Sequence, residues 1–285
     1  MAELLRGKTV ADSLNEETAQ KIRRLKKMGM TPTLAIVRIG NAPGDIAYER
    51  GAVKRASETG IIVRNLVFDR DISQSELEQE IRSLNKDASV HGVLIFRPLP
   101  GHIDEKVICD VLEPEKDVDG ITSLSAAGVF MDSGVGFPPC TAEACIEMLD
   151  HYGYDLEGKR VTVMGRSLVI GKPAAMMALK RNATVTICHS RTGEAVFCEA
   201  GKQADIVITA VGRGRMIKDR HLGRGQVIID VGINTDENGD LCGDVDFEEA
   251  VLSAGAITPV PGGVGSVTTA VLMKHVAEAA ENQSE

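Results

Sequence analysis

Aromatic side chains and positive charge are both scarce in this chain. Aromatic residues make up 3% of the 285 residues, and tryptophan is absent. Proteins that bind single-stranded nucleic acid stack the bases on aromatic rings, and a broad phosphate-binding surface needs an excess of Lys and Arg. Here 32 Lys and Arg face 41 Asp and Glu, a net charge of −9. We therefore expect no nucleic-acid partner, and we expect any anionic ligand to be held by a local basic patch.

Long apolar runs and paired metal-binding motifs are also missing. No segment approaches the ~20 apolar residues of a membrane span. The N-terminal residues 1–8 lack the apolar stretch of a signal peptide, so we expect a cytoplasmic protein with no membrane partner. The six cysteines form no Cys-x-x-Cys pair, and the six histidines form no His-Glu-x-x-His motif. We therefore expect neither a metal site nor structural disulfides.

Short β-rich runs alternate with helical patterns, which is typical of parallel βαβ units. A stretch rich in Gly, Pro and Asp at 113–140 separates two such series. We predict an α/β protein of two domains joined near residue 140, with a cleft between them as the expected binding site. The expected strands are 33–40, 61–68, 91–96, 160–165, 184–188, 205–211, 226–231 and 256–260, and the expected helices are 45–58, 73–86, 174–179 and 268–282.

A glycine-bearing turn follows the first strand of the second series. Gly165-Arg166-Ser167 leads, by way of Gly171, into a helical segment. Such a turn directs backbone N–H groups and a helix dipole at one point, which suits a phosphate. The spacing is Gly-x-Ser-x-x-x-Gly rather than Gly-x-Gly-x-x-Gly, so an ordinary α/β turn is an equally good interpretation of this motif alone.

The residues after the next expected strand, 184–188, indicate which dinucleotide the glycine turn would bind. An NAD site usually offers an acidic residue to the ribose there, whereas this chain has Ser190 and Arg191. Together with Arg166 these groups suit a 2′-phosphate, so NADP is favoured over NAD. Two alternatives stay open: Arg191 is a solvated surface charge, or Ser190 and Arg191 hold NAD with a phosphate ion.

Several motifs together resemble one family, the methylenetetrahydrofolate dehydrogenase/cyclohydrolases, from about residue 5 to the C-terminus. The matching motifs are Lys116-Asp117-Val118-Asp119-Gly120, Pro139-Cys140-Thr141, Gly165-Arg166-Ser167, Asp230-Val231-Gly232-Ile233-Asn234 and Pro259-Val260-Pro261-Gly262-Gly263-Val264-Gly265. The resemblance implies a folate-binding domain (1–140 plus 268–285), a Rossmann-like NADP-binding domain (141–267) and a homodimer joined through the latter. It also implies NADP-dependent oxidation of 5,10-methylenetetrahydrofolate, followed by hydrolysis of the methenyl product to 10-formyltetrahydrofolate.

The same resemblance assigns roles to individual residues. Tyr48 matches a tyrosine that packs against the pterin region, and Asp119 matches an aspartate that hydrogen-bonds the pterin ring; we expect both in the catalytic site. Pro261, Gly262 and Gly263 match a substrate-binding loop lying between folate and nicotinamide. Cofactor contacts are expected from Gly165, Arg166, Ser167, Ser190, Arg191 and Ile233.

Two positions depart from the family pattern. The family's hydrolytic lysine, four residues after the tyrosine, is Ala52 here, and the glutamine two residues before Pro-Leu-Pro is Phe96. Lys54 lies six residues after Tyr48, which on a helix is roughly 120° around the axis from it. General acid–base help is worth ~10²–10⁴ in rate. We therefore expect a dehydrogenase with weak or absent cyclohydrolase activity.

Two alternatives remain open at the level of the sequence. The first is a fully bifunctional enzyme in which Arg50, Lys54 or an ordered water replaces the missing base. The second is a catalytically silent subunit that only binds folate or nucleotide.

Overall fold

A computed structural model of the protein describes residues 2–283. The chain divides into two compact units. The six-stranded unit contains the residues up to Ala11 and Thr141–Thr268, and the three-stranded unit contains Asp12–Cys140 and the residues from Thr269 onward. No helix within residues 2–283 is both long and apolar enough to cross a membrane.

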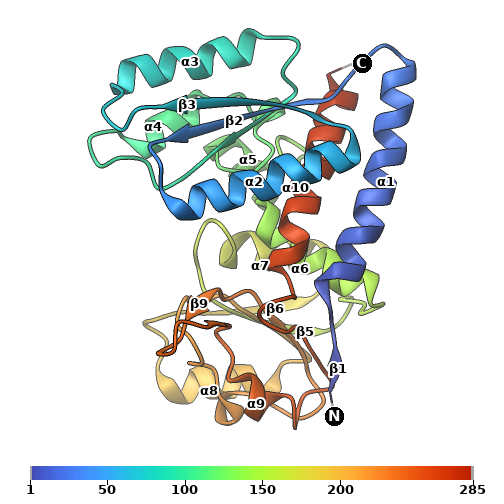
Figure 1. The fold of residues 1–285 in the computed structure, drawn as a ribbon. Coiled ribbons are helices and arrows are strands. Elements are labelled where there is room, and N and C mark those ends of the chain that lie inside the picture. Colours follow the sequence, from blue (N-terminus) through green and yellow to red (C-terminus); the bar gives the residue numbers. More distant parts are fainter. Residues whose placement is uncertain (1, 284–285) are drawn as a thin grey trace. The chain divides into compact units, whose positions relative to one another are not determined.

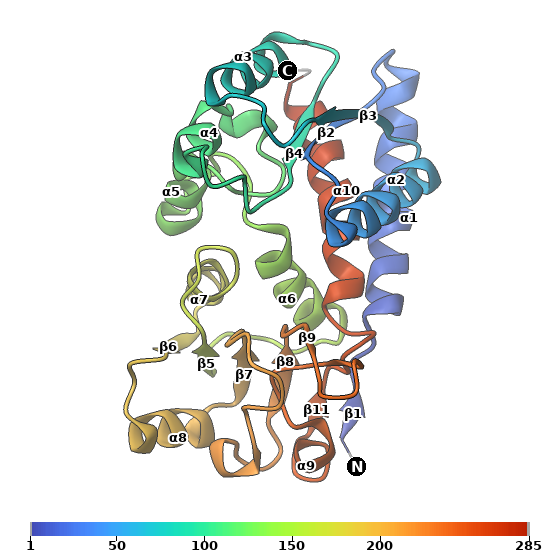
Figure 2. The ribbon, with the colours of Figure 1, turned by 60° about the vertical axis from the view of Figure 1, so that its left-hand side comes forward.

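The six-stranded unit is built on one fully parallel sheet of order β6-β5-β7-β8-β11-β1. Figure 2 shows these strands in one row, with β6 and β5 at one end and β1 at the other. The central strands are short and buried throughout, as expected for a parallel sheet that is covered on both faces. The strands are β1 (Glu3–Leu4), β5 (Arg160–Met164), β6 (Thr184–Cys188), β7 (Ile206–Thr209), β8 (Val227–Asp230) and β11 (Ala256–Ile257).

Helices α7 and α8 cover opposite faces of this sheet near β5 and β6 (Figure 2). Right-handed crossovers explain this arrangement, because the connection from β5 to β6 and the connection from β6 to β7 run in opposite directions across the sheet. The remaining elements of the unit are α6 (Cys140–His151), α7 (Gly171–Lys180), α8 (Glu194–Gln203), the 3₁₀ turn Asp219–His221, α9 (Phe247–Ala250) and the antiparallel pair β9 (Asn234–Thr235) and β10 (Leu241–Cys242).

The three-stranded unit contains a parallel sheet of order β3-β2-β4, formed by β2 (Thr33–Ile39), β3 (Ile62–Phe68) and β4 (Gly92–Ile95). In Figure 1, α3 lies on one side of this sheet and α2 on the other. Apolar residues of α3, α4, β2 and β4 form its core. The unit's helices are α2 (Pro43–Thr59), α3 (Gln74–Lys86), α4 (Glu105–Val111), the 3₁₀ turn Pro114–Lys116 and α5 (Ser123–Met131).

Two long helices pass from one unit into the other. Helix α1 (Gly7–Lys27) begins in the six-stranded unit, and α10 (Gly265–Asn282) does the same near the C-terminus. Within the three-stranded unit the Nζ of Lys21 on α1 lies 2.8 Å from a carboxylate oxygen of Glu281 on α10. This ion pair joins α1 to α10 within the three-stranded unit.

The predicted fold class, a two-domain α/β protein with a Rossmann-like parallel-sheet domain, is confirmed. All eight expected strands are present, although most are a few residues shorter than expected. The domain division differs at the N-terminus, because β1 pairs in parallel with β11 and so places the residues up to Ala11 with the six-stranded unit. The final helix begins at Gly265 rather than at 268, and α1 was not anticipated.

A Ser-x-x-Glu capping box is formed at the start of α3. The backbone N–H of Glu76 donates to Ser73 Oγ, and the backbone N–H of Ser73 donates to a carboxylate oxygen of Glu76 at 3.0 Å. These bonds satisfy backbone donors that the first turn of a helix otherwise leaves without partners.

Replacing this cap tests its contribution to stability. We expect Ser73→Ala to lower the free energy of unfolding by about 1 kcal/mol, measured by urea titration followed by circular dichroism. Ser83→Ala, at an exposed position of the same helix, is the control and should leave stability within ~0.5 kcal/mol. Equal effects of the two substitutions would contradict the capping role.

Candidate functional site

The six-stranded sheet has its switch point between β5 and β7. Strand β6 lies on one side of β5, and the next strand in the chain, β7, lies on the other. Ligands of open parallel sheets bind at the carboxyl ends of the strands at such a point. Gly165 ends β5 there with φ +145°, and a Cβ on it would lie 2.4 Å from the carbonyl oxygen of Ala210. Only glycine fits this position, and its small size leaves the backbone open to a ligand.

Ser167 organises the turn between β5 and α7. Its Oγ accepts the backbone N–H groups of Ile170 (3.1 Å) and Gly171 (3.4 Å). The hydroxyl therefore caps the start of the helix, and its own proton remains available to a ligand. Arg166 and Ser167 are both exposed.

A tight turn follows β6 and exposes the residues that are expected to bind the 2′-phosphate. Thr192 Oγ1 accepts the backbone N–H of His189 at 2.9 Å, and His189 Nδ1 accepts the backbone N–H of Arg191 at 3.1 Å. Ser190 and Arg191 at the apex are exposed. The glycine turn at Gly165 suits the backbone phosphates of NADP, and the hydroxyl of Ser190 with the guanidinium of Arg191, after the next strand, suits its 2′-phosphate.

Two buried carboxylates hold the loops after β7 and β8. Asp230 Oδ1 accepts the backbone N–H groups of Gly232 and Asp244 at 3.0 Å each, and its Oδ2 accepts that of Val245 at 2.9 Å. Asp244 in turn accepts the backbone N–H groups of three consecutive residues, 211–213. A Cβ on Gly232 would lie 2.4 Å from Asp244. Sequence reasoning matched Asp230 only as part of a motif and missed Asp244.

These loops form a pocket of about 210 Å³ at the carboxyl ends of β8 and β11. Ile233, Pro261, Gly262 and Gly263 all line it. Gly262 has φ +101° with no neighbouring atom within 4 Å of a built Cβ, whereas a Cβ on Gly263 would lie 2.5 Å from the carbonyl oxygen of Pro259. The structure thus brings the expected substrate loop and one expected cofactor contact into a single pocket.

The first two residues of the motif 116–120, in the three-stranded unit, form hydrogen bonds within the protein. The Nζ of Lys116 donates to the carbonyl oxygens of Leu84 (2.9 Å) and Asp87 (2.8 Å), which closes the C-terminal end of α3. The Asp117 carboxylate accepts the backbone N–H groups of residues 121 and 122 and the hydroxyl of Ser125. Lys116 and Asp117 are therefore used internally.

Asp119 is near enough to Tyr48 to influence the ionisation of its hydroxyl. Burial raises the pKa of the Asp119 carboxyl, against the lowering effect of its hydrogen bonds from Cys140. Burial likewise raises the pKa of the Tyr48 hydroxyl, and the nearby Cys140 and Asp119 raise it further. Tyr48 is therefore a neutral phenol at physiological pH, and its ring meets that of Phe96 edge-to-face at 5.7 Å. The structure brings these expected substrate residues together within one unit.

Ala52 lies on the same face of α2 as Tyr48, one turn further on, and is fully buried. Lys54 points elsewhere: its side chain is 80% exposed and its Nζ lies 4.0 Å from Glu58. The expectation that Lys54 is directed away from Tyr48 therefore agrees with the geometry.

Within residues 2–283, one group of three metal-ligand types lies close together: Glu194, Cys198 and His221. The backbone N–H of Lys218 donates to His221 Nδ1 at 2.9 Å and Arg220 Nε lies 3.2 Å from His221 Nε2, so both ring nitrogens already have hydrogen-bond partners in the protein. Arg220 also places a positive charge 3.5 Å from the Glu194 carboxylate, which opposes a bound cation. We assign no metal to this group.

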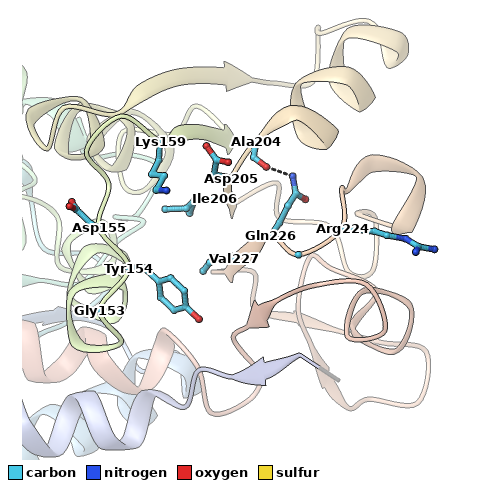
Figure 3. A pocket seen from close by; sticks show the side chains of 11 residues that line it. Gly153, Tyr154, Asp155, Lys159, Ala204, Asp205, Ile206, Arg224, Gln226 and Val227 are labelled. Carbon is cyan, nitrogen blue, oxygen red and sulfur yellow. Dashed lines mark hydrogen bonds between the residues drawn. The ribbon is translucent and has the colours of Figure 1, made fainter.

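A larger pocket, of about 450 Å³, lies at the amino ends of β5, β7 and β8 (Figure 3). Two of its polar side chains, those of Gln226 and Asp205, are hydrogen-bonded within the protein. The Gln226 amide donates to the carbonyls of Gly201 and Ala204, and the Asp205 carboxylate accepts the backbone N–H of Arg160. This edge is also opposite to the one that binds ligands in parallel sheets, so we assign it no ligand.

The parallel sheet, the glycine turn at its switch point and the groups after β6 define a two-unit α/β protein with a dinucleotide-type site. Two family models match the chain: the tetrahydrofolate dehydrogenase/cyclohydrolase catalytic domain over residues 5–119, and the NAD(P)-binding domain of the same family over residues 139–284. The chain belongs to the tetrahydrofolate dehydrogenase/cyclohydrolase family, as its motifs indicated.

Curated relatives and solved structures agree with this membership. A protein named bifunctional protein FolD from Alkaliphilus oremlandii is 48% identical over 283 residues, covering 99% of both chains. The protein of the same name from Clostridioides difficile is 47% identical over 282 residues, covering 99% of this chain and 98% of the relative. A Campylobacter jejuni bifunctional FolD structure superposes with a TM-score of 0.96 at 36% identity, covering 99% of both chains. A Trypanosoma brucei FolD structure complexed with NADP and inhibitor has a TM-score of 0.92 at 31% identity, covering 100% of this chain and 99% of that one.

The buried Asp230 carboxyl should make stability depend on pH. Burial raises its pKa from 3.8 to about 6, so between pH ~4 and ~6 the folded state retains a proton that the unfolded chain releases. The carboxyl's contribution is therefore greatest below pH ~4 and is lost as pH rises to about 6, by on the order of 2–3 kcal/mol.

Urea titrations from pH 4 to pH 7 measure this loss. Asp230→Asn cannot titrate, so its free energy of unfolding should fall less over that range than the wild type's. Because all other carboxyls are common to both proteins, the difference between the two slopes isolates Asp230. Parallel slopes would show that Asp230 does not titrate in this window.

Proposed function

We propose that this protein is an NADP-dependent 5,10-methylenetetrahydrofolate dehydrogenase, which forms 5,10-methenyltetrahydrofolate and NADPH. The observation that carries the proposal is the pocket in which Ile233 lies beside Pro261, Gly262 and Gly263. Membership of the family and the NADP-complexed Trypanosoma brucei structure support the choice of reaction and cofactor.

The cofactor residues have separable roles in this proposal. NADP, when bound, supplies the acceptor for the hydride that leaves the methylene carbon. Arg166, Ser190 and Arg191 hold the 2′-phosphate, and the Gly165–Ser167 turn receives the backbone phosphates. Gly262 and Gly263 give this loop a backbone without side chains between the two rings: Gly262 has φ +101°, which side chains rarely adopt, and a Cβ on Gly263 would meet the carbonyl oxygen of Pro259.

The substrate residues orient the pterin. The Asp119 carboxylate accepts hydrogen bonds from ring N–H groups, and the Tyr48 ring supports the pterin edge while its phenol stays protonated. Hydride transfer needs the donor carbon held in contact with the nicotinamide ring, and orientation of this kind can supply ~7–11 kcal/mol of the barrier reduction.

We also propose a cytoplasmic homodimer joined through the six-stranded unit. Strand β6 is an edge of the sheet, and most of its residues are exposed. A long exposed edge strand offers unpaired backbone groups to a second copy. Equilibrium sedimentation of the protein tests the dimer directly.

Cofactor choice and dehydrogenase activity are tested in one initial-rate experiment. We expect NADPH formation from 5,10-methylenetetrahydrofolate, and we expect Arg191→Ala to raise the KM for NADP⁺ about 10- to 100-fold while leaving that for NAD⁺ unchanged. The reason is that a hydrogen bond to a charged group contributes ~1.5–3 kcal/mol.

Arg224→Ala removes an exposed cation at the opposite edge of the sheet and is the matched control. No turnover with either nucleotide would favour the silent binding subunit. A wild type that prefers NAD⁺ would contradict the assignment of Ser190 and Arg191.

For the hydrolytic step, the comparisons favour the bifunctional alternative over a weak or absent cyclohydrolase. Both curated relatives and the Campylobacter jejuni structure carry bifunctional names. The residue-level reason for expecting slow hydrolysis remains Ala52 and Phe96, which leave an apolar surface beside Tyr48. A bifunctional chain must therefore activate water by another route than the family's lysine.

The double substitution Ala52→Lys with Phe96→Gln distinguishes these two interpretations. If the missing pair limits hydrolysis, the variant should hydrolyse 5,10-methenyltetrahydrofolate ~10²-fold or more faster than the wild type, followed by loss of its absorbance. Phe96→Gln is included because a lysine buried against a phenyl ring would lack a polar partner.

Lys54→Ala provides the control, because its side chain is exposed and should not affect the rate. Fast hydrolysis by the wild type, with no gain in the double variant, establishes the bifunctional enzyme. A loss of hydrolysis in Lys54→Ala would assign the missing base to Lys54.

A further inference from the structure

The backbone carbonyl of Val118 accepts two hydrogen bonds from side chains far away in the sequence. The Cys140 thiol donates to it at 3.2 Å, and His275 Nδ1 donates to it at 2.8 Å. Cys140 begins α6, and His275 lies in α10. Both side chains are essentially fully buried, at 0% and 1% exposure. Two separate helices therefore converge on one peptide group.

These contacts require a proton on Nδ1 of His275. A carbonyl oxygen only accepts, so Nδ1 must carry a proton. The Cys140 Sγ lies 3.6 Å from the same nitrogen, and it cannot donate to a nitrogen that is itself a donor. Cys140 and His275 thus both donate to Val118 and do not form a hydrogen bond with each other.

The residue after Val118 is Asp119, which also contacts Cys140. The backbone N–H of Cys140 donates to the Asp119 carboxylate, and the single proton of the Cys140 thiol has that carboxylate and the Val118 carbonyl as alternative acceptors. On the other side of Val118, Asp117 is held by hydrogen bonds from residues 121, 122 and 125. The peptide between the two aspartates therefore has little freedom to rotate.

Packing reinforces the same contact. The Phe137 ring lies 4.9 Å from the His275 ring, centroid to centroid. Gly120 has φ +62°, and a Cβ on it would lie 2.5 Å from the backbone nitrogen of Pro139. The turn that contains Asp119 therefore packs closely against the segment that ends in Cys140.

We propose that Cys140 and His275 are positioning residues: by fixing the Val118 peptide they hold the Asp119 carboxylate in the orientation that accepts the pterin N–H groups. This inference rests on the proposed function, because it assumes that Asp119 binds folate. Buried donors aimed at a carbonyl from two helices restrict the direction of the neighbouring side chain, and misplacement of a substrate by ~1 Å can cost ~10² in rate.

Paired variants keep or remove each donor. Cys140→Ser keeps a donor and Cys140→Ala removes it. His275→Asn keeps a donor where Nδ1 lies, whereas His275→Gln moves it toward the position of Nε2. Cys145→Ala is the matched control, because Cys145 is equally buried in the same helix and its thiol donates to Thr141 instead.

We expect Cys140→Ala and His275→Gln to lower kcat/KM for 5,10-methylenetetrahydrofolate about 10- to 100-fold while the KM for NADP⁺ stays within twofold. Cys140→Ser and His275→Asn should recover most of the loss, and Cys145→Ala should match the wild type. Thermal melting of each variant confirms that it is folded.

The pH profile supplies a readout that a purely structural role would not move. The groups that influence the pKa of Asp119 are Cys140, Asp117 and Arg97, and Asp119 in turn raises the pKa of Tyr48. The Cys140 thiol lowers the pKa of Asp119, so its removal should shift the acid limb of kcat/KM to higher pH. The limb should stay in place in Cys145→Ala.

The outcomes separate this inference from the function on which it rests. If the wild type oxidises the substrate and folded Cys140→Ala and His275→Gln behave like Cys145→Ala, the positioning role is wrong and the dehydrogenase stands. If the wild type neither oxidises the substrate nor binds tetrahydrofolate in a calorimetric titration, both proposals fall. If the variants raise the KM for substrate and the KM for NADP⁺ equally, Cys140 and His275 contribute only to general packing.

Discussion

Buried carboxylates that accept backbone N–H groups hold the functional loops of both units. Asp230 and Asp244 do so in the six-stranded unit, and Asp117 does so in the three-stranded unit. A carboxylate taken out of water is strongly destabilising unless donors surround it, so each one fixes the path of the loop that supplies those donors. Ile233 and Asp119 each lie two or three residues from such an anchor, and their positions follow from it.

Because each of these carboxylates bonds within its own unit, neighbouring side chains can be substituted without altering the fold. Ala52 lies on α2 and Phe96 follows β4, and neither donates to an anchoring carboxylate. A change at these two positions affects the surface beside Tyr48 while the glycine turn, the Asp230 loop and the Asp119 turn stay in place. The high similarity to bifunctional relatives over the whole chain is therefore compatible with local differences in the hydrolytic site.

Local patterns predicted most elements but few of their connections. The strands were recognisable because buried parallel strands are continuous apolar runs. The pairing of β1 with β11 joins residues about 250 positions apart, and no short pattern indicates such a contact. Helix α1 was missed because its sequence is largely polar and its burial depends on distant partners such as α10.

The sequence by itself determined the fold class and the family, since these are properties of periodicity and of motifs. Only the tertiary structure showed what these motif residues do. Lys116 and Asp117 form hydrogen bonds with the protein's own backbone, and Ser167 caps a helix. Only the tertiary structure, too, brought Cys140 and His275 onto the Val118 carbonyl. The physical reason is that hydrogen bonds between buried groups depend on distances in space, which packing sets and spacing along the chain does not.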